Sequence, residues 1–210
     1  LIVSIILTII IFPFYPILGL LLLIISFFLL YFFRDPIRII PNENVIVSPA
    51  DGKIVFLGDS DLPEECDIEG EYLKISIFLD IFNVHVNRIP ISGIVKDIKY
   101  ISGKFFSANI EKSSKENERN IIIIENNIKE KIIVTQIAGL IARRIVCDLK
   151  IDQKVSRGDR FGIIKFGSRV DLYLPKKYNT MINIGQIVIG GETIISNPNH
   201  ILSINKSNKV

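Results

Sequence analysis

Cysteine and histidine are scarce in this 210-residue chain, which has two of each and no tryptophan. Cys66 and Cys147 lie far apart and form no C-x-x-C pair. This argues against a structural zinc site and excludes a disulfide scaffold. The net charge is only +3 and no dense block of Lys and Arg is present. Nothing therefore indicates nucleic-acid binding.

Charge is absent from residues 1–33, so all 25 Lys and Arg and all 22 Asp and Glu residues fall in residues 34–210. That later part has the charged fraction of an ordinary soluble domain. The partition excludes a disordered chain and a polytopic membrane protein. The chain is therefore divided into a hydrophobic membrane anchor, residues 1–33, and one folded domain, residues 34–210.

The apolar run of residues 1–33 is the strongest physical signal in the sequence. It is too long for a secretory signal peptide, and a bilayer crossing takes roughly 20 apolar residues as helix. Pro13 and Pro16 interrupt any continuous helix. We expect either one membrane helix over about residues 17–33 or a re-entrant helical hairpin. Arg34 and Arg38 follow at once, which predicts a cell-membrane protein with its domain on the cytoplasmic side.

Short β-branched runs alternate with turn residues from residue 45 onward, and no long stretch has the 3.6-residue period of a helix. This pattern predicts a mainly β, β-rich α+β domain whose sheet is mostly antiparallel. The polar run 109–120 is expected to be a surface loop. Strands are expected at residues 45–47, 53–57, 72–78, 93–100, 121–125, 131–136 and 161–166.

The C-terminal part contains a weak internal repeat. Residues 151–161 align with residues 184–194 at an offset of 33, with Ile, Gln, Val and Gly at matching positions. Two similar strand–turn–strand units of this kind predict the halves of a flattened antiparallel barrel or sandwich with lipoyl-like elements.

Three segments carry residues suited to chemistry, and each also has a plain structural interpretation. Asp51 stands before Gly52, which is typical of a simple turn. His85 is a natural proton shuttle near neutral pH, yet an isolated histidine in a β protein is often structural. Gly167 and Ser168 lie between two strand-like runs, where such a pair commonly closes a hairpin. General spacing rules leave these alternatives open.

An ordered set of motifs then points to one family. The chain resembles the short, membrane-attached form of phosphatidylserine decarboxylase, a pyruvoyl-dependent family whose members are proenzymes. The motifs cover most of residues 33–192 in family order: FRDP at 33–36, SPADGK at 48–53, FNVHVNRIP at 82–90, GLIARR at 139–144 and RFGIIKFGSRVDLYLP at 160–175.

The resemblance implies self-cleavage between Gly167 and Ser168 into chains 1–167 and 168–210, which stay together as a heterodimer. Ser168 becomes a pyruvoyl group that forms a Schiff base with the serine amine of the lipid headgroup, so neither pyridoxal phosphate nor a metal is expected. Asp51 and His85 match the family's charge-relay partners. Longer relatives have two histidines in this motif, whereas Arg88 stands here near the second position.

The implied reaction converts phosphatidylserine in the bilayer to phosphatidylethanolamine and CO2. Arg88 and Arg169 are candidates for holding the phosphate of the substrate, since guanidinium groups suit that anion. Alternatives are an archaetidylserine-type decarboxylase of ether lipids, a membrane-anchored β-barrel binding module without catalysis, and a biotinyl or lipoyl carrier domain. A higher homo-oligomer is left open.

Overall fold

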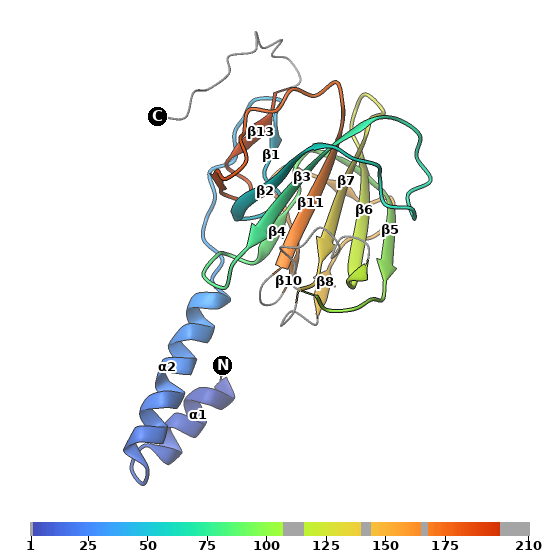
Figure 1. Cartoon of the computed structure of the whole chain (residues 1–210). Helices are drawn as coiled ribbons and strands as arrows, with labels where there is room; N and C mark the ends of the chain where they lie inside the picture. The colour runs from blue at the N-terminus through green and yellow to red at the C-terminus, as the bar shows by residue number, and fades with distance from the viewer. Residues whose placement is uncertain (1, 107–115, 140–143, 165–167, 198–210) are drawn as a thin grey trace.

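The computed structural model describes residues 2–106, 116–139, 144–164 and 168–197. Figure 1 shows two helices that project from one end of a curled β-domain. Helix α1 spans Ile2–Ile11 and α2 spans Pro16–Phe32, and the two pack side by side as a hairpin. The interruption expected at Pro13 and Pro16 is confirmed, because α1 ends at Ile11 and Pro16 opens α2, where a missing backbone N–H does no harm.

The hairpin is closed by one small residue and one polar contact. A Cβ on Gly19 would lie 2.6 Å from the Cα of Phe12, so only glycine allows the chain before α2 to come this close. The Ser26 hydroxyl donates to the Ser4 hydroxyl at 2.9 Å across the two helices. Of the two forms expected for residues 1–33, the hairpin is the one present.

Within the part of the chain that the structure describes, neither α1 nor α2 combines the length and the apolar character that a bilayer crossing requires. The expected single membrane helix over residues 17–33 is therefore not supported. The physical reason is Pro16, which sets the start of α2 and limits it to 17 residues.

The described residues of the β-domain form three antiparallel sheets. The eight-stranded sheet has the order β12-β2-β3-β11-β7-β6-β5-β9, a second has the order β4-β10-β8, and β1 pairs with β13. The strand bounds are β1 Ile46–Val47, β2 Gly52–Asp59, β3 Tyr72–Leu79, β4 Val86–Arg88, β5 Gly93–Ile101, β6 Arg119–Glu125, β7 Lys131–Ile137, β8 Ile145–Cys147, β9 Lys154–Val155, β10 Arg160–Ile164, β11 Ser168–Pro175, β12 Ile187–Val188 and β13 Ile194–Ser196.

Strand β11 lies at the centre of the large sheet, between β3 and β7. Its alternate residues Val170, Leu172 and Leu174 are fully buried in the main apolar core inside the curled sheet. Tyr173 points to the other face, where it joins a smaller apolar cluster with Tyr72 and partly buried residues of the loop after β2. Both faces of β11 are therefore covered, and seven of its eight residues are buried.

The internal repeat expected from the sequence is confirmed in the backbone. Gly158 and Gly191 have φ values of 85° and 83°, and Asp152 and Gly185, also one repeat apart, have φ values of 65° and 90°. Positive φ at matching positions shows that both segments make the same turns.

The repeat extends to the whole eight-stranded sheet as an approximate two-fold arrangement. Lys53 in β2 and Ile94 in β5 occupy equivalent positions in the two halves of the sheet. Lys53 pairs with Ile187 in β12 and Ile94 pairs with Lys154 in β9, and these two partners are one repeat apart. Both β2 and β5 also carry an irregularity at the same point of their pairing with the next strand. The two-fold axis passes through the facing pair Leu172 and Val134 at the centre of the sheet.

All seven strands expected from the sequence are present, and the chain is β-rich and antiparallel as predicted. The sheet curls into a half-barrel. The central β11 is the strand-like run expected after Gly167 and Ser168, and β9 and β12 lie within the two expected strand–turn–strand units. The short β4 and β8 correspond to none of the expected runs. The expected surface loop at 109–120 is wrong at its end, because Asn117 and Arg119 are buried and β6 begins there; residues 107–115 lie outside the described part.

The hairpin makes a direct prediction. In a chain with Cys66→Ser and Cys147→Ser, replacing Ser4 and Ser26 with cysteine should give an intramolecular disulfide on mild oxidation, because their side-chain oxygens lie 2.9 Å apart. The product is read as a shift in gel mobility that reductant reverses. Each single cysteine variant is the control, and adding Gly19→Leu should prevent the bond. A disulfide that forms equally well with Gly19→Leu would contradict the close packing of α1 and α2.

Candidate active site

The strand register brings the three predicted catalytic residues to one end of the domain. Ser168 opens β11 and faces Leu79, the last residue of β3. Asp51 immediately precedes β2, whose Lys53 pairs with Phe78 on the other side of β3. Strands β2 and β11 are therefore two strand spacings, about 10 Å, apart at this level.

His85 reaches the same end from the smaller sheet. Val86 in β4 pairs with Ile163 in β10, so His85 lies beside the end of β10. The chain then runs from Ile164 to Ser168 through residues 165–167, which lie outside the described part together with the expected cleavage residue Gly167. His85 thus lies near Ile164, the last described residue before the predicted cleavage point.

Ser168 is completely buried. Its hydroxyl has no hydrogen-bond partner among the described residues. Leaving a buried hydroxyl unpaired costs free energy, so such a group at the start of a central strand calls for an explanation. A serine whose hydroxyl is kept free of other partners is suited to nucleophilic attack and to conversion into another group.

His85 is held in one protonation pattern by its surroundings. Its Nδ1 lies 2.9 Å from the backbone oxygen of Asn83. A carbonyl only accepts, so Nδ1 carries the hydrogen and Nε2 of the neutral ring carries the lone pair. Nε2 is buried and has no partner within the described residues. Burial lowers the pKa of His85, so the neutral ring with a free basic nitrogen is favoured.

Asp51 is bound by groups other than His85. Both of its carboxylate oxygens accept from Nη2 of Arg38, at 3.0 and 2.8 Å, and Oδ1 also accepts from the backbone N–H of Gly190. In the described residues no hydrogen bond joins Asp51 to His85. The structure brings the two expected relay partners to one end of the domain, but it does not place them in direct contact.

Arg88, expected to hold phosphate, already has protein partners. It donates to Asp35 at 2.8 Å and to the backbone oxygen of Gly158 at 3.0 Å. Arg160 approaches the other oxygen of Asp35 at 2.5 Å. A cavity of about 380 Å³ adjoins Arg88, Arg160 and Gly158. The two arginines thus form an anion-binding site, in which the carboxylate of Asp35 is bound.

Arg169 is placed differently from what its position next to Ser168 suggested. Side chains alternate along a strand, so Arg169 points to the opposite face of the sheet from Ser168. There it is buried and its Nε lies 2.9 Å from Asp171, which also lies 3.4 Å from Nζ of Lys74. The expectation that Arg169 holds the substrate phosphate is not supported, because its guanidinium forms part of a buried ion cluster on the other face.

The residues that the sequence reasoning missed lie mainly between α2 and the β-domain. Arg34, Asp35 and Arg38 were treated as a topological signal or as part of a motif, yet they bind Phe82, Arg88 and Asp51 respectively. An Arg-Asp-Pro-x-Arg segment directly after an apolar run is the one signal that pointed to them. We call residues 34–40 the strap.

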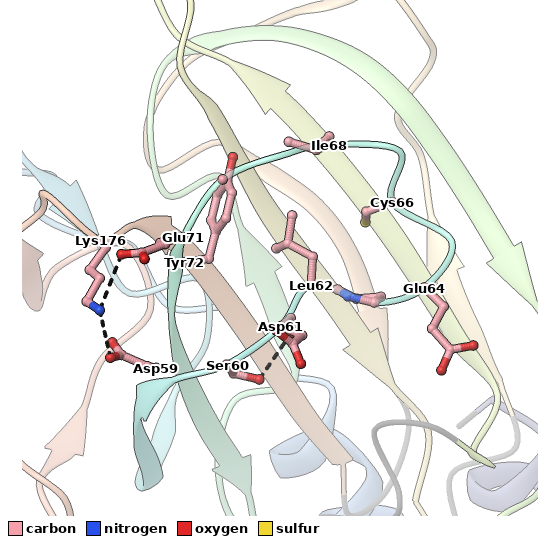
Figure 2. A pocket seen from close by; sticks show the side chains of 12 residues that line it. Asp59, Ser60, Asp61, Leu62, Glu64, Cys66, Ile68, Glu71, Tyr72 and Lys176 are labelled. Atoms are coloured by element: carbon pink, nitrogen blue, oxygen red, sulfur yellow. Dashed lines mark hydrogen bonds and ion pairs between the residues drawn. The ribbon is translucent and has the colours of Figure 1, made fainter.

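A cavity of about 550 Å³ lies away from these residues. Figure 2 shows it under the loop that joins β2 to β3, where Lys176 reaches Asp59 and Glu71 at 3.0 and 3.3 Å. These residues lie at the far end of β2 and β11 from Ser168. Among the described residues, no three His, Cys, Asp or Glu side chains are grouped so as to hold a metal ion.

Comparison with known proteins decides the family. The sequence model described as "Phosphatidylserine decarboxylase" matches residues 25–196. The chain belongs to the phosphatidylserine decarboxylase family. The match includes α2 from its middle onward, the strap and all of the strands. The family is one of decarboxylases, that is, carboxy-lyases.

Several bacterial members of the phosphatidylserine decarboxylase family are similar over most of this chain. The phosphatidylserine decarboxylase proenzyme of Wolbachia pipientis wMel is 55% identical over 172 residues, 80% of this chain and 75% of the relative. The proenzyme of Ehrlichia chaffeensis is 53% identical over 181 residues, 85% and 79% of the two chains. That of Rickettsia prowazekii is 50% identical over 169 residues, 80% and 73%.

The ion pair of Arg38 and Asp51 yields a prediction about stability. Their side chains are only 9% and 15% exposed, so removing one partner leaves a mostly buried charge unpaired. Arg38→Leu should lower the free energy of unfolding by about 3 kcal/mol, and adding Asp51→Asn should restore part of the loss. Urea unfolding of the full chain in detergent, with Ser168→Ala to keep it uncut, measures both.

Lys176→Ala is the matched control, since it breaks an exposed ion pair with Asp59 and should cost less than about 1 kcal/mol. Equal losses for Arg38→Leu and Lys176→Ala, or strictly additive effects of Arg38→Leu and Asp51→Asn, would contradict a specific buried pair.

Proposed function

We propose that this chain is a pyruvoyl-dependent phosphatidylserine decarboxylase that makes its own prosthetic group from Ser168. One observation carries the proposal: the serine of the family motif opens the central strand with a buried, unpartnered hydroxyl, at the same end of the domain as His85. The similar relatives are called proenzymes, which fits a chain that must be cut before it acts.

The proposed cleavage uses groups of the chain alone. The Ser168 hydroxyl attacks the carbonyl carbon of Gly167, and the peptide bond becomes an ester with a free amine on residue 168. Loss of the α-proton of residue 168 then breaks the ester, so residues 1–167 leave with a terminal carboxylate. The remaining dehydroalanine takes up water and releases ammonia, which leaves a pyruvoyl group at the start of chain 168–210. The orphaned hydroxyl of Ser168 fits this group.

His85 is the proposed base for the attack. Its Nδ1–H is bound to Asn83, so Nε2 is the nitrogen that can accept the proton of a hydroxyl. Asp51 is proposed to act at the same end as the second relay residue that the family resemblance implies. Direct contact between Asp51 and His85 is not part of this proposal, because Asp51 is bound to Arg38.

In decarboxylation the pyruvoyl group supplies a carbonyl that binds the substrate amine and accepts the electron pair left when CO2 departs. His85 then returns a proton to the α-carbon of the product, a step that needs an acid near neutral pH. Arg88, together with Arg160, is proposed to face the substrate phosphate, since both already bind a carboxylate beside a cavity. The backbone of the lipid, ester or ether as in archaetidylserine, is not distinguished by these contacts.

The two fragments are proposed to remain one folded unit. Strand β11 belongs to fragment 168–210, whereas its neighbours β3 and β7 belong to fragment 1–167. Separating the fragments would expose Val170, Leu172 and Leu174, all fully buried. The repeat in the backbone supports the finer assignment of the domain as a flattened barrel with lipoyl-like elements.

Residues 1–33 are proposed to attach the protein to the cytoplasmic face of the cell membrane, where phosphatidylserine is found in the bilayer. Most apolar side chains of the hairpin are exposed, among them Phe14 at 77% and Ile17 at 89%. A face this apolar is suited to the interior or the surface of a lipid bilayer. A diacyl substrate stays in the bilayer, so attachment brings the reaction end of the domain to it.

The intact mass of the purified protein tests the cleavage. We expect two fragments, residues 1–167 and 168–210, with the smaller one carrying a ketone in place of the Ser168 amine and side chain. Treatment with hydroxylamine should shift only the mass of the smaller fragment. Ser168→Ala should give one uncut chain, and Ser156→Ala is the control that should be cut normally.

Release of CO2 from phosphatidylserine labelled in its carboxyl group, presented in mixed micelles, tests the reaction. The cut protein should be active and the Ser168→Ala chain inactive. A single uncut chain that is nevertheless active would overturn the proposed cofactor. An uncut and inactive unmutated chain would instead favour a membrane-anchored binding module on the same fold.

A further inference from the structure

The end of α2 forms part of the surroundings of His85. Figure 1 shows that α2 meets the β-domain only at its C-terminal end. Phe32, the last residue of the helix, is fully buried, whereas Leu30 and Tyr31 before it are 49% and 46% exposed. Its ring centroid lies 4.2 Å from that of His85, with an angle of 35° between the two planes. The helical hairpin therefore delivers one buried side chain to the candidate active site.

The contact is held from both sides. Arg34 donates from Nη2 to the backbone oxygen of Phe82 at 2.7 Å and from Nη1 to that of Tyr31 at 2.8 Å. The guanidinium also lies 3.7 Å from the centre of the Tyr31 ring. Arg34 lies two residues after Phe32, and its partner Phe82 lies three residues before His85. Arg34 thus connects the last turn of α2 to the loop that leads into His85.

The loop itself has a fixed shape that continues this connection. The backbone N–H of Asp80 donates to the side chain of Asn83, and the N–H of Phe82 donates to the side chain of Asp80. The backbone oxygen of Asn83 in turn accepts from Nδ1 of His85. The imidazole is therefore fixed at one nitrogen by the loop and covered on a ring face by Phe32, which leaves Nε2 as its free functional atom.

Aromatic cover affects the charge of His85 as well as its orientation. A ring packed on the imidazole keeps water away, and loss of water disfavours the charged form. Two charged groups also face His85: Asp80 raises its pKa and Arg34 lowers it, while burial is the largest influence and lowers it. A neutral ring with Nε2 unprotonated is the form in which His85 accepts a proton from Ser168.

We propose that Phe32 is a positioning residue for His85, so that the last turn of the apolar helix α2 is one wall of the reaction centre. The inference rests on the proposed function, in which His85 moves protons. It gives the N-terminal helices a role beyond attachment, because the side chain that orients the base stands directly beside residues that face out of the domain toward lipid.

The direct test observes His85 itself and needs no activity. The chain has two histidines, so His200→Gln leaves a single imidazole signal. In the uncut Ser168→Ala chain in detergent micelles, nitrogen NMR of labelled histidine gives the tautomer and the pKa of His85. Phe32→Ala should raise the pKa toward the ordinary 6.5 and mix the two tautomers, and Phe32→Leu should have a smaller effect because it keeps apolar cover.

Phe27→Leu is the matched control, since Phe27 lies on the same helix and is 63% exposed. It should leave the His85 signal unchanged. If Phe32→Ala and Phe32→Leu both leave the tautomer and the pKa of His85 as they are in the parent chain, the inference is overturned, whatever the protein does catalytically. Phe32→Leu keeps the test valid if Phe32→Ala disturbs the end of the helix.

The functional test uses the chain with Ser168 intact. Full-length precursor is synthesised in a cell-free system with detergent, and the appearance of fragment 168–210 is followed at pH 5.5 to 8. With Phe32→Ala, the pH midpoint of self-cleavage should move upward, and a rise of one unit in the pKa of His85 corresponds to about tenfold slower cleavage at low pH. The Phe27→Leu precursor should follow the unmutated one.

The two ideas fail in different ways. If the unmutated precursor does not cut itself, the proposed function fails. The NMR experiment still decides whether Phe32 positions His85, because it uses the uncut Ser168→Ala chain. If the precursor cuts itself with the same pH midpoint with and without Phe32, the positioning role is overturned and the proposed function is kept.

Discussion

The rest of the structure depends on the pairing of β11 between β3 and β7. Because this strand begins at Ser168, a cut before it would leave the new chain end at the centre of the sheet rather than at an edge. The strand is buried on both faces, with Leu172 in the main core and Asp171 in an ion pair with Arg169 on the other side. A bond can therefore be broken at its start without releasing the strand, since its backbone hydrogen bonds and its side chains hold it to the larger fragment. A serine on a loop or an edge strand would lack this support.

The eight-stranded sheet is nearly two-fold symmetric, but the candidate active site lies at only one end of it. The register that relates the two halves places Glu130 where Ser168 stands and Ser92 where Asp51 stands. At that second end Glu130 accepts hydrogen bonds from Asn126 and Tyr178, so its polar groups bind one another. Ser168 and Nε2 of His85 are instead left without partners among the described residues. Unpaired buried polar atoms occur elsewhere in the described residues too, for example the hydroxyls of Ser76 and Thr135. The Ser168 end differs because a serine hydroxyl and a basic histidine nitrogen, two groups suited to proton transfer, are left unpaired at the same end of the domain.

Local patterns in the sequence predicted most of the elements, but not the contacts between distant residues. The β-branched runs predicted seven strands, the prolines predicted the break between α1 and α2, and a short repeat predicted two similar strand–turn–strand units. The short strands β4 and β8, which build the smaller sheet beside His85, were not predicted. Arg38 was not connected to Asp51, since a single arginine after an apolar run has no periodic signal that identifies its partner. Phe32 was one aromatic among many in residues 1–33, and only the folded chain distinguishes it by its burial. Arg169 was suggested by its place next to Ser168, but two adjacent residues of a strand point to opposite faces of the sheet.

Ion pairs, rather than apolar contacts, attach the strap to the β-domain near the candidate active site. Replacing a buried pair by apolar side chains is often neutral or stabilising, so Asp35 with Arg88 and Arg38 with Asp51 are not needed for stability alone. Their geometry is directional, however, whereas apolar contacts allow a segment to slide. The strap must connect an apolar hairpin to a polar site, and each ion pair fixes one point of that path, with the N–H of Ile39 on Glu192 as a third. An apolar helix whose position varied would move Phe32 relative to His85. Fixed points on the strap prevent this, which is a physical reason for placing charged residues directly after the longest uncharged run in the chain.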